Sequence, residues 1–104
     1  MNHKTGRVNI EWTREAVKDL KKIYEFYVQN FSQELAQKVK NQILDKVKTL
    51  ELGTELGQQE ELLLKSKGYR YLICNHNKII YKVEKNNAYI THVFDTRQNP
   101  EKLK

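Results

Sequence analysis

The chain has 104 residues, which is the size of one domain, and its 19 Lys and Arg against 13 Asp and Glu give a net charge of +6. A hydrophobic content of 38% is enough for a modest core, the one cysteine excludes an internal disulfide, and no apolar run approaches the roughly 20 residues of a membrane span. We therefore expect a single domain over residues 1–104 in the cytoplasm, without a membrane contact, and a partner that is anionic, such as nucleic acid or an acidic protein.

A short strand and two helices are predicted in the first half of the chain. Residues 7–12 alternate apolar and polar side chains, as a strand does, and Thr13 and Ser32 are the predicted N-caps of the helices that follow. Apolar residues recur at helical spacing and are expected in the core: Ala16, Leu20, Ile23, Tyr24, Tyr27 and Phe31, then Ala36, Val39, Ile43, Val47 and Leu50. The short link between the helices predicts that they are antiparallel, and Gly53 is expected to end the second.

Strands are predicted in the second half, after a surface loop over residues 53–61. A short strand is expected at 61–65 and firmer ones at 69–74, 78–84 and 88–94, with turns at 75–77 and 85–87. The last strand is the most apolar and is expected to be central. The predicted fold class is α+β, with an N-terminal antiparallel helical hairpin packed on one face of a small twisted antiparallel β-sheet.

Side-chain alternation predicts a basic face on this sheet, because alternate residues of a strand point to opposite faces. If the tyrosine, isoleucine and valine side chains of 69–74 and 78–84 point to the helices, Arg70, Lys78 and Lys82 share the open face. Arg97, just beyond the last strand, can join them, whereas a slip of one residue would invert the assignment. Because such cations bind phosphate, the four predict a phosphate-binding surface, and a solvated basic face is the alternative.

Other reactive residues form no pattern that predicts a site. His3, His76 and His92 are too scattered for a local metal site, and His92 is expected to be a hydrogen-bonded structural histidine. Cys74 has no evident base beside it and is expected to be a small buried side chain. Since the chain also lacks a glycine-rich phosphate loop, no cofactor and no metal are expected.

Four segments in this order resemble the RelE/ParE superfamily of bacterial toxins, of the plasmid stabilisation type. They are IEWTREAVKDLKKIYEFY, SQELAQKVKNQILDKVKTL, YRYLICNHNKIIYKV and YITHVFDTRQNPEKL, and together they cover nearly the whole chain. The resemblance implies the toxin of a type II toxin–antitoxin pair, neutralised by a cognate antitoxin. Operator DNA would then be bound only through the antitoxin.

The superfamily divides by target, and the two groups imply different roles for the cations. In RelE-like members, which cleave messenger RNA on the ribosome without a metal, Arg70 and Lys78 would hold the scissile phosphate and Arg97 would stabilise the transition state. Those nucleases also use a tyrosine beyond that arginine, but here no tyrosine follows Tyr89.

The opening pattern W-T-x-x-A-x-x-D-L, from Trp12 to Leu20, is more similar to ParE-like members, which poison DNA gyrase. The resemblance therefore favours a gyrase inhibitor that meets its target through Arg70, Lys78, Lys82 and Arg97. A ribosome-dependent endoribonuclease is the alternative, and a non-toxic basic nucleic-acid-binding module is the second alternative.

Overall fold

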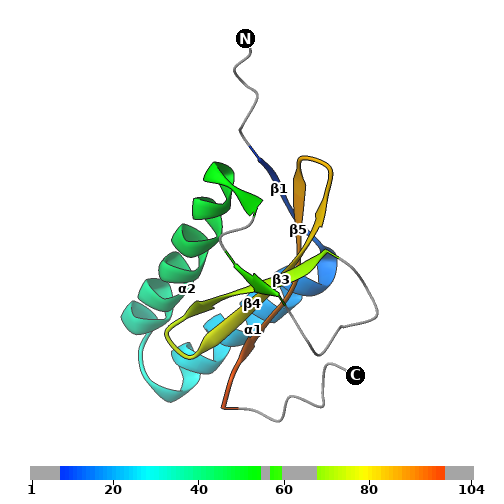
Figure 1. Ribbon diagram of the computed structural model, residues 1–104. Coiled ribbons are helices and arrows are strands. Elements are labelled where there is room, and N and C mark those ends of the chain that lie inside the picture. Colours follow the sequence, from blue (N-terminus) through cyan, green and yellow to red (C-terminus); the bar gives the residue numbers. More distant parts are fainter. Residues whose placement is uncertain (1–7, 55–56, 60–67, 98–104) are drawn as a thin grey trace.

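The computed structural model describes residues 8–54, 57–59 and 68–97, and it confirms the α+β class (Figure 1). Two antiparallel helices, α1 (Arg14–Asn30) and α2 (Gln33–Lys48), pack on one face of a sheet, and a 3-10 turn, η1 (Thr49–Leu52), follows α2. The strands are β1 (Asn9–Trp12), β2 (Gln58–Gln59), β3 (Tyr69–Cys74), β4 (Asn77–Glu84) and β5 (Asn87–Asp95).

The sheet has the strand order β1-β5-β4-β3-β2, and its pairing is mixed. The antiparallel meander from β3 to β5 is as predicted, but β1 pairs with β5 in the parallel sense. The pairing of β1 is set by the packing of α1, not by a tight turn, so the local sequence carries no signal for its direction. The last strand is interior, between β1 and β4, while β4 occupies the middle of the sheet.

The predicted loop over residues 53–61 contains a strand, because Gln58 and Gln59 pair with Tyr71 and Arg70. The strand expected at 61–65 lies outside the described residues. Gly53 is the C-cap of η1, beyond the end of α2, so the helical segment ends where its glycine predicts.

Both predicted N-caps are confirmed, and the first also fixes α1 to the sheet. The Thr13 hydroxyl accepts a hydrogen bond from the Ala16 amide at 3.2 Å and donates one to the Ile90 carbonyl of β5 at 2.8 Å. One turn further on, the Asp19 carboxylate accepts from the Val93 amide at 3.0 Å. The fully buried Ala16 lets the helix approach β5 closely. The W-T-x-x-A-x-x-D-L pattern is thus the set of contacts that seats α1 on β5.

The core fills the space between the helices and the sheet, and its largest fully buried side chains are Tyr81, Ile43, Leu50, Ile79 and Ile90. Three predicted core residues lie outside it: Tyr24 and Tyr27 are half-buried, and Phe31, the C-cap of α1, has 63% of its surface exposed. The helical stripe ends at Asn30, so the chain turns into α2 and carries the Phe31 ring out of the core. Of the described helices, none combines the length and the apolar character needed to span a bilayer.

Candidate functional site

The strand register divides the predicted basic face. Tyr69, Tyr71 and Ile73 of β3 lie opposite Lys82, Ile80 and Lys78 of β4, so these six residues share the face without helices. Leu72 and Cys74 are buried on the helix side, and Arg70 shares their parity. The expectations that Arg70 lies on the open face and that the tyrosines of β3 point inward are both wrong. Both alternating sets of residues in YRYLIC contain apolar side chains, so the pattern alone could not show which set faces the helices.

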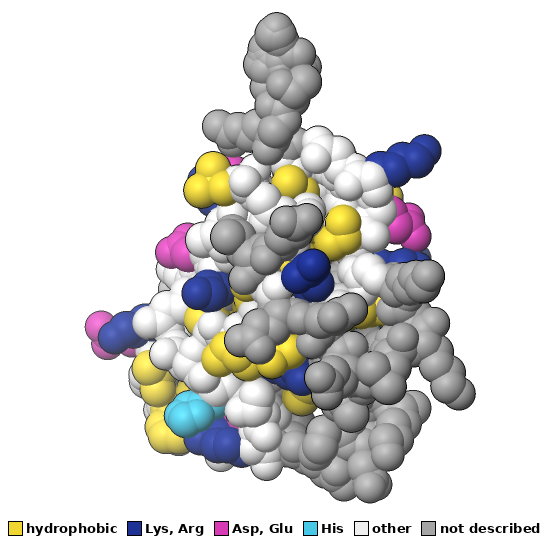
Figure 2. All heavy atoms as spheres, viewed as in Figure 1, with side chains coloured by type: hydrophobic (Ala, Val, Ile, Leu, Met, Phe, Trp, Pro, Cys, Tyr) yellow, Lys and Arg dark blue, Asp and Glu magenta, His cyan; other side chains and the backbone are white. Residues whose placement is uncertain are grey.

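On the helix-free face, aromatic and basic side chains lie in three cross-strand rows. Figure 2 shows hydrophobic and basic side chains interspersed in this view of the molecule. The rows are Tyr69–Lys82–Tyr89, Tyr71–Ile80–His92 and Ile73–Lys78–Phe94. Each lysine lies against a ring, with the Lys78 ammonium 4.3 Å from the Tyr71 ring centre and the Lys82 ammonium 5.6 Å from that of Tyr69. Lys82 also forms an ion pair with Glu84 at 3.3 Å. The prediction is therefore confirmed for the placement of Lys78 and Lys82.

Arg70 binds the chain itself. Its guanidinium donates to the Gly57 carbonyl at 2.8 Å, while the Tyr81 hydroxyl accepts from the Gly57 amide at 2.9 Å and donates to the Thr54 carbonyl at 2.7 Å. Burial raises the pKa of Tyr81, against the smaller opposing effects of the Gly57 amide and of Arg70. The three hydrogen bonds hold Thr54 and Gly57 against β3 and β4.

Arg97 lies near the end of α1, apart from the two lysines. Its Nε donates to Asp95 Oδ1 at 2.9 Å, and its backbone amide donates to the same oxygen at 2.8 Å. The hydrogen bond from Arg97 holds the pKa of Asp95 below its ordinary value, and the bond to Asp95, with a weaker one to Tyr27, raises the pKa of Arg97. Tyr27 belongs to α1, so the guanidinium is turned toward the helix layer. The four predicted cations thus occupy three separate places.

The histidine and cysteine candidates form no reactive or metal-binding group among the described residues. His92 lies on the helix-free face, where its Nδ1 is 3.1 Å from the Thr91 hydroxyl beside the β-bulge, as expected for a hydrogen-bonded histidine. Cys74 is buried, and burial raises the pKa of its thiol. Within the described ranges no three His, Cys, Asp or Glu side chains gather as metal ligands, and His3 lies outside those ranges.

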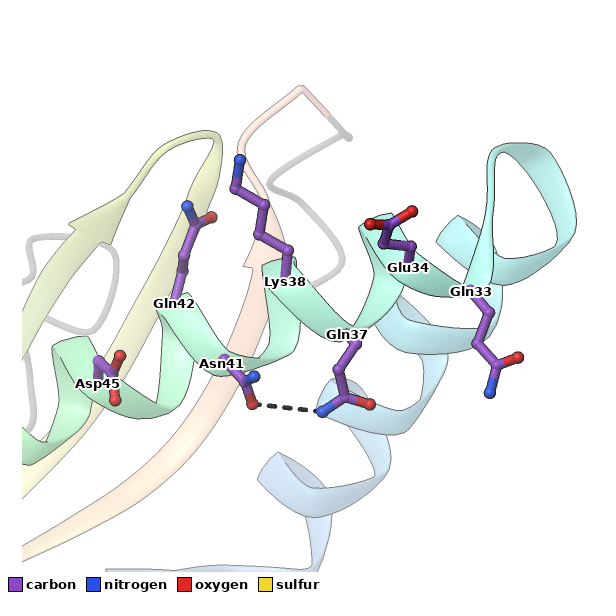
Figure 3. A pocket seen from close by; sticks show the side chains of 7 residues that line it. All are labelled: Gln33, Glu34, Gln37, Lys38, Asn41, Gln42 and Asp45. Atoms are coloured by element: carbon purple, nitrogen blue, oxygen red, sulfur yellow. Dashed lines mark hydrogen bonds between the residues drawn. The ribbon is translucent and has the colours of Figure 1, made fainter.

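A shallow hollow on the outer side of α2 contains none of the predicted residues (Figure 3). Its lining is polar and comes from one helix: Gln33, Glu34, Gln37, Lys38, Asn41, Gln42 and Asp45. Gln37 Nε2 donates to Asn41 Oδ1 at 3.3 Å, one turn apart, which is an ordinary pairing on a helix surface.

Comparison with solved structures assigns the fold to a class of proteins. The chain is similar to a protein of the chromosomal ParDE toxin–antitoxin system from P. aeruginosa, with 25% identity, a TM-score of 0.74, and coverage of 88% of this chain and 98% of that one. The RelBE2 toxin–antitoxin complex from Mycobacterium tuberculosis shares the fold at 13% identity and a TM-score of 0.65, covering 90% and 97%. The YoeB dimer from Staphylococcus aureus shares the fold at 24% identity and a TM-score of 0.56, with coverage of 83% of this chain and 93% of that one. The fold is that of the RelE/ParE toxins.

The sequence then identifies the family within this class. Residues 10–100 match the family described as the ParE toxin of the type II toxin–antitoxin system parDE. The chain belongs to this family of toxins. No curated protein sequence matches it significantly.

Proposed function

We propose that this toxin inhibits growth by ParE-like poisoning of DNA gyrase. The observation that carries the proposal is the separation of Arg70, Lys78 and Arg97, the three residues that a RelE-like nuclease would need around one phosphate. Cleavage without a metal requires charged groups aimed within hydrogen-bonding distance at the same reacting atoms. Arg70 is bound to the Gly57 carbonyl on the helix side, whereas Lys78 lies on the helix-free face.

Asp95 further disfavours a nuclease. Its carboxylate holds the Arg97 guanidinium through both Nε and Nη2, and would repel a phosphate that approached the same group. Membership of the ParE family and the likeness to a ParDE protein support gyrase as the target from a separate direction.

A cognate antitoxin is the second partner that we propose, since structures similar to this chain include a ParDE system and a complex of YoeB with YefM. Lys78 and Lys82 on the helix-free face are the residues that we expect to meet an acidic antitoxin segment or the target. Operator DNA would be contacted only through the antitoxin, and with these partners the protein would act in the cytoplasm.

The test runs two assays on the same purified toxin. Supercoiling and cleavage-complex assays with bacterial gyrase should show inhibition and trapped DNA breaks, while primer extension on translated message should show no new ends. Growth arrest after induction should be relieved by the antitoxin. New message ends without an effect on gyrase would contradict the proposal.

The helix-free face gives one reason to retain the endoribonuclease as a second candidate. Lysines interleaved with tyrosines at the Tyr69–Lys82–Tyr89 row are a pattern that binds single-stranded nucleic acid by stacking and charge. In that case Arg97→Ala should abolish message cleavage, and unchanged cleavage would remove the catalytic role of Arg97. If induced expression caused no growth defect, a non-toxic nucleic-acid-binding module would be the better description.

A further inference from the structure

The turn between α1 and α2 presents an aromatic cluster to solvent. Phe26, Tyr27 and Phe31, which we name the aromatic tip, have ring centres 5.3 to 6.3 Å apart. Phe26 is 49% exposed and Phe31 is 63% exposed, so about half or more of the surface of these two residues lies outside the core. Two edge-to-face pairs and one tilted pair hold the rings against one another, so the cluster keeps a defined shape without a partner.

Arg97 borders the tip from another element. Figure 1 shows the α1–α2 turn and the end of β5, just before Arg97, at the same end of the molecule, and interaction with Tyr27 contributes to the raised pKa of Arg97. The Asp95 carboxylate binds the same guanidinium at both Nε and Nη2, yet 57% of the Arg97 side chain is exposed. An arginine that is already oriented loses little conformational entropy when a partner binds it.

The charge around the tip separates it from the rest of this basic chain. Residues 23–37 contain no lysine or arginine and include Glu25 and Glu34, although the chain carries 19 basic residues in total. Arg97, the cation that borders the tip, is balanced by Asp95. Such a surface does not attract nucleic acid, which binds through unbalanced positive charge, and it does not attract an acidic antitoxin. Aromatic rings with an arginine and few other charges are the composition of the energetically dominant centre of protein–protein interfaces.

We propose that the aromatic tip, with Arg97 at its border, is the surface by which this toxin docks on gyrase. The inference rests on the proposed function and specifies its contact. Phe26 and Phe31 insert into an apolar pocket of the gyrase protein, and Arg97 donates a hydrogen bond to an uncharged polar group at the rim. The lysines of the helix-free face are left for the antitoxin, so the two partners use different faces.

The test compares Phe26→Gln and Phe31→Gln with Leu52→Gln. Leu52 lies in η1, is 82% exposed, and serves as a control for removing an exposed apolar side chain elsewhere. Affinity for purified bacterial gyrase is measured by surface plasmon resonance, beside supercoiling inhibition and affinity for the antitoxin. Each tip variant should lose at least about tenfold in gyrase affinity, and Leu52→Gln less than about twofold. Antitoxin affinity should be unchanged in all three, which also verifies that the variants fold.

Each other outcome overturns the docking surface in a recognisable way. Unchanged gyrase affinity in both tip variants would show that the tip is not the contact. Loss of antitoxin affinity with gyrase affinity retained would assign the tip to the antitoxin. Wild-type toxin that neither binds nor inhibits gyrase would refute the proposed function itself, and the inference with it.

Discussion

At the scale of single residues, the Asp95–Arg97 pair turns a cation that the sequence offers for ligand binding into an internal contact. An aspartate two residues before an arginine, just after a strand, is visible in FDTRQNP, but its consequence depends on where the chain turns. The pair leaves a signature in the pH dependence of stability.

We expect the wild type to lose more stability on acidification than Asp95→Asn does. The folded-state pKa of Asp95 lies below its ordinary value of 3.8, so the pair stabilises the fold fully above that value, and the contribution disappears as the pH falls through the folded-state pKa. Urea unfolding of both proteins from pH 6 to pH 2.5 measures the difference, which should be small because Arg97 is exposed. If the free energies of unfolding of the two proteins changed in parallel below pH 4, a stabilising Asp95–Arg97 pair would be excluded.

Gly57 illustrates a residue whose importance only the structure reveals. A Cβ on Gly57 would lie 2.5 Å from both the Tyr71 carbonyl oxygen and the Tyr81 hydroxyl, whereas one on Gly53 would meet nothing within 4 Å. Gly57→Ala should therefore destabilise the protein by about 1–3 kcal/mol, and Gly53→Ala should change its stability by less than about 0.5 kcal/mol. Chemical denaturation of both variants measures this, and equal effects would contradict the close packing of residue 57.

At the scale of elements, the sequence predicts those features that depend on neighbours in the chain. The caps Thr13 and Ser32, the three long strands and their turns all follow from local residue preferences, and all are present. The direction of β1 and the contact of Arg70 with Gly57 depend on residues far apart in the chain, and local patterns do not contain them.

The two helix caps should differ in their effect on stability. Thr13→Ala removes the bond to Ala16 and also the bond to Ile90 of β5, whereas Ser32→Ala removes one exposed bond to Leu35. We expect Thr13→Ala to cost about 1–2 kcal/mol and Ser32→Ala about 0.5–1 kcal/mol of unfolding free energy. Thermal and urea unfolding compare the two, and an equal or reversed order would mean that Thr13 does not anchor α1 to the sheet.

At the scale of the whole molecule, the residue types of the candidate site could be predicted from the sequence, but the faces on which these residues lie could not all be predicted. The sequence identified Lys78 and Lys82 as neighbours on an open face because 78–84 has one clearly apolar parity. It placed Arg70 on the same face, since β3 is apolar at both parities, and it assigned Phe31 to the core because a stripe does not show where the helix ends. The surface that results has basic and aromatic residues on the helix-free face and a tip almost without cations.

This separation predicts that salt weakens binding of the antitoxin much more than binding of gyrase. Lys78 and Lys82, which are half-buried, attract an acidic antitoxin through charge that salt screens beyond about 8–10 Å, whereas apolar contacts at the aromatic tip are insensitive to salt. Raising the salt from about 0.1 M to 0.5 M should therefore weaken antitoxin binding by roughly tenfold or more and gyrase binding by less than about threefold. The double variant Lys78→Gln/Lys82→Gln should reduce the salt dependence of antitoxin binding, and Lys18→Gln on the exposed side of α1 should not. If salt weakened both partners equally, the two would be held by the same basic surface, and the division of the molecule into two binding faces would be wrong.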